Sequence, residues 1–141
     1  MTTKELRRLT VAGVVALTVL VLYWALWYLA RDVVRSDDSH AYYDFENAFP
    51  LADARLGLCV LLAVRAVHRG SPTALLWLLT GGGAGVYLFC MDALYDLEHG
   101  IYATGAGGVI QLAINLLTLG LSAWFLRWAW SRRDVLLSSP G

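Results

Sequence analysis

The segment Leu9–Ala30, LTVAGVVALTVLVLYWALWYLA, decides the fold class, because it runs for 22 residues without a charged side chain. About 20 residues of α-helix are enough to cross the hydrocarbon core of a bilayer, which is about 30 Å thick. Lys4, Arg7 and Arg8 precede this segment, as basic residues also precede the core of a secretory signal peptide. The segment is longer than a usual cleaved core and no small-residue cleavage site follows it. We therefore interpret it as a retained membrane-spanning helix.

The composition of the whole chain agrees with a membrane protein. Of the 141 residues, 58% are hydrophobic and 16% are charged, whereas soluble domains are about 45–50% apolar and about 25% charged. Two further segments, Gly70–Met91 and Gly100–Leu126, carry no charged residue, and a fourth, Leu51–Val67, carries charges only toward its ends. We predict an all-α integral membrane protein with a single membrane domain, residues 1–141, in which four transmembrane helices form an antiparallel bundle. The helices are expected at about 9–30, 50–67, 72–99 and 107–130, with an outer loop at about 31–49.

Charged residues predict the orientation of this bundle. The chain has 11 basic and 11 acidic residues, and this balance excludes a nucleic-acid-binding protein with a strongly basic face. Most basic residues fall on one side of the predicted membrane, and the positive-inside rule places that side, with both termini, in the cytoplasm. These residues are Lys4, Arg7, Arg8, Arg65, Arg69, Arg127, Arg132 and Arg133. Most acidic residues fall on the other side, which predicts an acidic outer face. The preference for arginine over lysine is typical of a GC-rich bacterial genome, so we expect the plasma membrane of a bacterium.

Aromatic residues gather toward the same outer face. Tyr23, Trp24, Trp27 and Tyr28 stand at the end of the first apolar segment, and residues 42–49 alternate aromatic and polar side chains. Amphipathic rings settle at the headgroup boundary, so we interpret these residues as interface anchors in preference to a ligand cage. Together with the acidic residues, they predict an acidic, aromatic outer mouth.

The strongest chemical pattern follows the second uncharged segment. Asp92, Asp96 and His99 are spaced i, i+4 and i+7, so a helix places them on one face with Tyr95 beside them. They fall at the C-terminal end of the predicted helix, where the helix dipole disfavours anions by about 0.3–1 kcal/mol each. Something must therefore compensate these carboxylates.

Three interpretations of this cluster stay open. The first is a structural ion pair between Arg55 and Asp92. The second is a site for a polar ligand or a divalent cation, formed by the cluster together with Asp44 and Glu46 of the outer loop. Two carboxylates and a histidine suit several metals, so the pattern does not select one. The third interpretation is plain exposure of the cluster to solvent.

Polar and small residues predict how the helices meet. Gln111, Asn115, Thr118 and Ser122 share one helical face, which must avoid lipid because buried amides need partners. For Thr118 and Ser122 we expect hydrogen bonds within the protein. For Gln111 and Asn115, bonds between helices and the wall of a polar cavity are equal alternatives. The glycine-rich segment 81–85 predicts close helix packing, with a break in the helix as the alternative.

These observations predict the class of protein more firmly than its function. We expect a small, non-enzymatic membrane subunit, or a protein that binds a ligand or partner at the outer mouth. One alternative is a membrane enzyme for a lipid or sterol-like substrate, with Asp92 or Asp96 as acid/base group and Gln111 and Asn115 as stabilisers. Another is a small cation or proton carrier. We expect no cofactor and no nucleic acid, the bilayer as partner, a polar or lipid-like ligand or another membrane protein as further partners, and a homo-oligomer.

Overall fold

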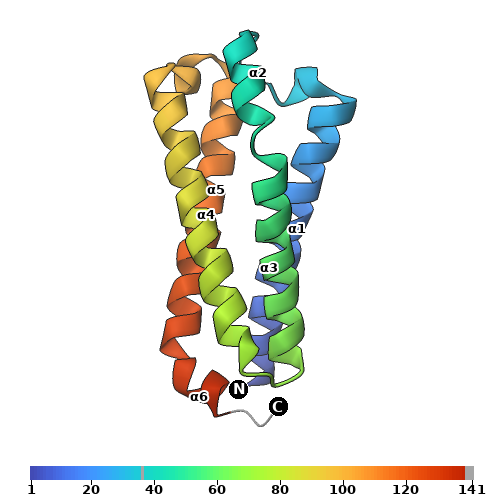
Figure 1. Cartoon of the computed structure of the whole chain (residues 1–141), viewed down its shortest axis with the longest axis vertical. Helices are drawn as coiled ribbons and strands as arrows, with labels where there is room; N and C mark the ends of the chain where they lie inside the picture. Colours follow the sequence, from blue (N-terminus) through green and yellow to red (C-terminus); the bar gives the residue numbers. More distant parts are fainter. Residues whose placement is uncertain (36, 139–141) are drawn as a thin grey trace.

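The computed structural model of the chain describes residues 1–35 and 37–138, and these residues form helices without any strand. Four long helices lie side by side along the long axis of the molecule (Figure 1): α1 (Thr3–Leu29), α3 (Pro50–His68), α4 (Thr73–Glu98) and α5 (Ala106–Ser131). The shorter elements are η1 (Arg31–Val33), α2 (His40–Glu46), η2 (Ile101–Ala103) and α6 (Arg133–Leu137). The N-terminus, α6 and the α3–α4 turn lie at one end of the molecule, here called the terminus end, and α2 lies at the other, the α2 end (Figure 1).

Three of these helices, α1, α4 and α5, are long and apolar enough to cross a membrane, which supports a membrane-embedded protein. The fourth, α3, is shorter at 19 residues, and charged residues toward its two ends interrupt its apolar stretch. Residues 31–49, which we expect to form an irregular outer loop, are partly helical, because η1 and α2 lie within them. Ser39 starts α2 by accepting a hydrogen bond from the backbone N–H of Tyr42, at 3.2 Å.

Local sequence signals set the ends of the long helices. Thr2 and Glu5 form a reciprocal capping box at the start of α1, in which each side chain accepts from the backbone N–H of the other residue. α4 ends at Glu98, and Gly100 follows with a φ of 66°, a left-handed conformation that glycine adopts without strain. This stop turns the chain back into α5 after the short helix η2.

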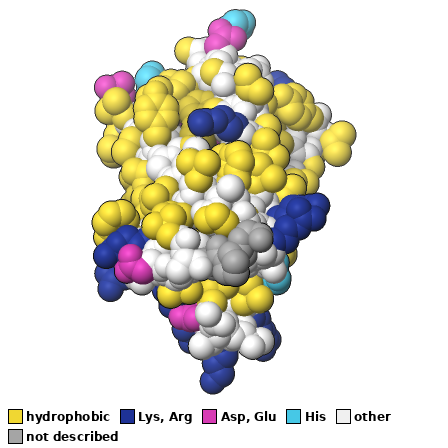
Figure 2. All heavy atoms as spheres, turned by 60° about the horizontal axis from the view of Figure 1, so that its bottom comes forward, with side chains coloured by type: hydrophobic (Ala, Val, Ile, Leu, Met, Phe, Trp, Pro, Cys, Tyr) yellow, Lys and Arg dark blue, Asp and Glu magenta, His cyan; other side chains and the backbone are white. Residues whose placement is uncertain are grey.

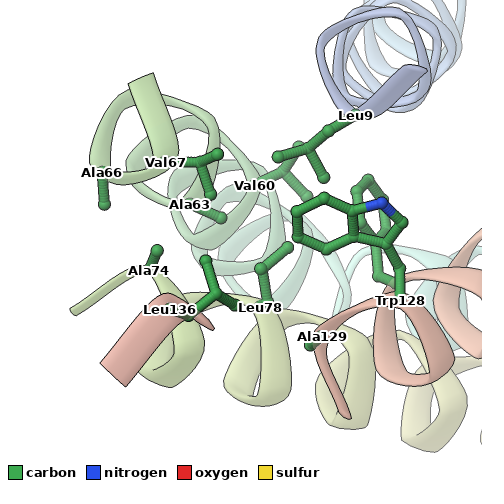
Figure 3. Close-up of a cluster of buried hydrophobic side chains, with 11 residues drawn as sticks. Leu9, Val60, Ala63, Ala66, Val67, Ala74, Leu78, Trp128, Ala129 and Leu136 are labelled. Atoms are coloured by element: carbon green, nitrogen blue, oxygen red, sulfur yellow. The ribbon is translucent and has the colours of Figure 1, made fainter. Parts of the chain in front are cut away.

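The hydrophobic core at the terminus end joins all four long helices (Figure 3). Leu9 of α1, Leu78 of α4 and Trp128 of α5 are at most 5% exposed, and Ala63 of α3 lies among them. Leu136 of α6 closes the cluster from below and is also buried. The buried polar side chains among the described residues lie outside this cluster, so apolar packing fills the interior at the terminus end; they are Glu46, Asp96, Gln111, Asn115 and Ser122.

The glycine-rich segment of α4 packs closely against α5. A Cβ atom at Gly82 would lie 2.7 Å from Cγ of Leu126 and 3.2 Å from the backbone oxygen of Ser122, and one at Gly85 would collide with the Ser122 hydroxyl. α4 passes through this segment without interruption. Close approach of the two helices, and not a break in α4, therefore accounts for these glycines.

Basic side chains surround the terminus end, as Figure 2 shows for the face that turns this end toward the viewer, while hydrophobic side chains cover much of the remaining surface. One of these basic side chains, that of Arg132, forms an ion pair between two helices. The Arg132 guanidinium lies 2.6 Å from a carboxylate oxygen of Glu5 and 4.9 Å from the ring centroid of Trp128. This ion pair ties the first turn of α1 to the end of α5.

Candidate functional site

A cavity of about 120 Å³ lies among the four long helices and extends from the middle of the bundle toward the α2 end. Its wall is mostly apolar, and each long helix contributes a leucine: Leu20, Leu56, Leu88 and Leu121. The ionisable lining residues come from elements that meet near the α2 end, namely Glu46 of α2, Asp53 of α3 and Asp92 of α4. The cavity thus has an apolar body and an acidic end.

Two of the acidic groups accept hydrogen bonds from aromatic side chains of α1. The Tyr23 hydroxyl donates to Glu46 over 2.6 Å, and the Trp24 indole N–H donates to Asp53 over 2.9 Å. Glu46 is only 3% exposed, so its carboxyl group reaches down from α2 into the interior. These bonds connect α1 with α2 and α3 at the acidic end.

The other two acidic groups accept hydrogen bonds from amides of α5. Gln111 donates through Nε2 to Asp92 over 3.0 Å, and Asn115 donates through Nδ2 to Asp96 over 2.8 Å. The same Asn115 nitrogen also lies 2.8 Å from the hydroxyl oxygen of Tyr102. Asp96 and Asn115 are at most 2% exposed. Four carboxyl groups of α2, α3 and α4 are thus each bonded to a neutral donor of α1 or α5.

No lysine, arginine or histidine is among the described residues that line the cavity. The expected pair between Arg55 and Asp92 is not formed, because Arg55 lies exposed and none of the ion pairs among the described residues includes it. The reason is rotation along α3. Asp53 faces the cavity, and two residues further along a helix the side chain points roughly 200° away. Arg55 and Asp92 were expected at similar depths in the membrane, but Arg55 lies on the side of α3 that faces away from the cavity.

Two buried acceptors in this region have no donor among the described residues: Oε1 of Gln111 and Oδ1 of Asp96. Gln111 is 2% exposed and lines the cavity. A buried carbonyl oxygen without a partner costs roughly 1–3 kcal/mol. The acidic end of the cavity therefore offers one acceptor, Oε1 of Gln111, that the described residues leave unsatisfied, while Asp96 and the equally unpartnered hydroxyl of Tyr95 lie outside the lining.

The electrostatics of this end favour positive charge. Burial, with the nearby charges of Asp96 and Asp53, raises the pKa of Glu46 to about 7. Glu46 lies on α2, outside the long helices, and its proton is held more firmly there than in water. A positive group near Glu46 would relieve the same repulsion.

The structure does not gather the remaining predicted residues into the cavity. His99 lies exposed with its ring stacked on Tyr95, at 4.0 Å between centroids, and Nδ1 lies 2.9 Å from the Tyr95 backbone oxygen. Asp44 is exposed and lies 2.8 Å from His40. Tyr95 stacks on Phe45 of α2, with centroids 3.9 Å apart, so these rings cover the α2 end.

The proposed cation ligands Asp92, Asp96 and His99 do not converge. Within residues 1–35 and 37–138 there is no group of three or more His, Cys, Asp or Glu side chains that could hold a metal ion. The hydrogen bonds to Gln111 and Asn115 direct both carboxylates toward α5, while the ring of His99 lies along its own helix against Tyr95. The geometry thus gives a divalent cation no ligand set here.

The sequence patterns missed three participants. Asp53 had an ordinary explanation, because an anion in the first turn of a helix is favoured by the helix dipole. Tyr23 and Trp24 matched interface anchors, but their polar atoms point to carboxyl groups inside the protein. The available signal was the coincidence of these donors with acidic residues at the same predicted depth.

Comparison with protein families, with curated proteins and with solved structures finds no match for this chain, so the cavity itself carries the argument about function.

Proposed function

We propose that the chain is a four-span membrane protein of the bacterial plasma membrane with both termini in the cytoplasm. Three apolar helices support membrane insertion, and the position of α3 beside them supports a fourth span. The basic residues at the terminus end support a cytoplasmic location of that end. The acidic end of the cavity then lies near the outer surface.

Within this framework, we propose that the protein binds a small ligand in the cavity and is not an enzyme. The observation that carries this proposal is an apolar cavity inside the helices with a few polar groups at one end, as is typical of ligand sites. The volume of about 120 Å³ is close to that of an engineered apolar cavity of roughly 150 Å³ that takes up benzene. The apolar body of the ligand is therefore expected to be no larger than a single aromatic ring or a short alkyl chain.

The apolar core at the terminus end favours binding over transport. Below the cavity, Leu9, Leu78 and Trp128 fill the space between the helices without a polar side chain among the described core residues. A carrier for protons or cations needs polar groups or water along its path. The cavity is therefore better suited to hold a ligand than to pass one across the membrane.

Occupation of the cavity can be tested with ligands that share one ring and differ in their polar group: toluene, benzyl alcohol, benzylamine and phenylacetate. Thermal unfolding in detergent measures binding, since a ligand that prefers the folded state raises Tm. Ala16→Leu adds side-chain volume to the lining and should abolish the Tm increase. Ala113→Leu adds the same volume at an exposed position of α5 and should leave the increase unchanged.

Three outcomes would speak against this function. No Tm increase with any of the four compounds removes the evidence for a ligand site. An increase that Ala16→Leu does not affect places binding elsewhere. Recovery of chemically altered compound after incubation supports a membrane enzyme instead.

A further inference from the structure

The donors and acceptors at the acidic end are unequal in number. The donors Tyr23, Trp24, Gln111 and Asn115 are all engaged with carboxyl groups. Among the described residues that line the cavity, the buried side-chain atom left without a partner is Oε1 of Gln111, which is an acceptor, so a ligand that hydrogen-bonds to it must bring its own donor.

The charged residues at this end also favour a ligand that carries hydrogen-bond donors. Glu46, Asp53 and Asp92 all line the cavity, and Asp92 interacts electrostatically with the other two. No basic side chain of the described lining balances them. Three acidic groups close together, one of them buried, favour a cationic occupant over an anionic one.

The unpartnered amide oxygen of Gln111 indicates where a donor group of the ligand would bind. Gln111 is 98% buried, since its exposure is 2%, and it holds Asp92 through Nε2 while Oε1 has no donor. A group with several N–H bonds can donate to Asp92 and to Gln111 together. An ammonium group offers three donors and a full positive charge, as the lysine side chain does.

Resting on the proposed function, we propose that the ligand is an amine with an apolar body, bound as its ammonium ion. Asp92 is its counter-ion and Gln111 Oε1 its neutral acceptor. The rings of Tyr23 and Trp24 also line the cavity, and aromatic rings attract cations within about 6 Å. The leucines of the lining hold the apolar body.

The four ring compounds named above test this class directly at pH 7. Benzylamine should bind at least roughly tenfold more tightly than benzyl alcohol, because hydrogen bonds to charged groups are the stronger ones. Phenylacetate should not bind, because its carboxylate meets three others. Asp92→Asn should lower the affinity for benzylamine by roughly tenfold or more and leave that for benzyl alcohol nearly unchanged. Asp44→Asn, which removes an exposed carboxylate outside the cavity, should change neither.

The outcomes separate the ligand class from the proposed function. Binding of benzyl alcohol, toluene or phenylacetate as tightly as benzylamine overturns the amine assignment but leaves the cavity a ligand site. Equal loss of benzylamine and benzyl alcohol in Asp92→Asn also overturns it. Absence of binding by all four compounds overturns the proposed function and this inference with it. The comparison of the four compounds on the unaltered protein needs no variant to fold.

Discussion

The amide nitrogen of Asn115 lies 2.8 Å from a carboxylate oxygen of Asp96, and both side chains are buried between α5 and α4. The bond crosses from one long helix to the next where α4 approaches its end. It satisfies one oxygen of Asp96 and leaves the other without a donor among the described residues. Together with the bond from Gln111 to Asp92, it joins α5 to α4 at the α2 end.

Asn115→Leu should lower the free energy of unfolding by about 1–3 kcal/mol, because it leaves a buried carboxyl group without a donor. The double variant Asn115→Leu with Asp96→Leu should lose less than the sum of the single variants, since neither polar partner remains. Chemical denaturation in detergent measures these values. Leu116→Ala, at an exposed position of α5, is the control, and equal losses for Asn115→Leu and Leu116→Ala would contradict the role of the bond.

The buried carboxyl group of Glu46 should make stability depend on pH. Its pKa is raised from an ordinary 4.5 to about 7, so the folded state holds this proton more firmly than the unfolded state. The stability that the protonated group contributes is complete below pH 4.5 and is lost as pH rises through about 7. Glu46→Gln should remove this fall in Tm between pH 4.5 and 7. Asp44→Asn should retain it, and a pH profile that Glu46→Gln leaves unchanged would refute the assignment.

Neighbouring glycines of α4 should respond oppositely to alanine. Gly82→Ala places a methyl group against Leu126 and the Ser122 backbone, and we expect a loss of about 1–3 kcal/mol from overpacking. Gly83→Ala points into open space and should be neutral or stabilising by up to about 1 kcal/mol. Denaturation of the two variants side by side gives the comparison. Equal effects would show that close packing does not explain Gly82.

The proposed orientation can be tested by labelling single cysteines in intact cells. In a background with Cys59→Ala and Cys90→Ala, Ala41→Cys on α2 should react with an impermeant maleimide. Asp134→Cys on α6 should react only after the cells are permeabilised. Both positions are exposed in the structure. The reverse pattern would place the acidic end of the cavity on the cytoplasmic side.

Apolar runs predicted the long helices well because a helix in lipid must satisfy its backbone internally, whatever its neighbours are. The segment around Leu9–Ala30 became α1 for this reason, and the runs behind α4 and α5 did likewise. The sequence pattern did not predict the helix formed by residues 40–46, because this helix is short and its apolar residues show no clear helical periodicity. Its signal was local, in the capping residue Ser39.

The candidate site was harder to predict, because its contacts depend on which sides of the helices pack against each other. Spacing correctly grouped Gln111 with Asn115 on one side of α5, and the structure places both at the cavity and in bonds to α4. Spacing also grouped Asp92 with His99, although the ring of His99 instead stacks on Tyr95. The pairs formed by Tyr23 and Trp24 join distant parts of the chain, and no periodicity within one helix encodes them.

The link between Glu5 and Arg132 has a mechanical consequence. α1 packs chiefly on α3 and touches α5 sparsely, so this ion pair is a point where the two helices are held together at the terminus end. The opposite end of α1 is tied as well, because Tyr23 donates to Glu46 and Trp24 donates to Asp53. α1 is thus fastened at both of its ends, and loss of either fastening alone should leave the helix attached by the other.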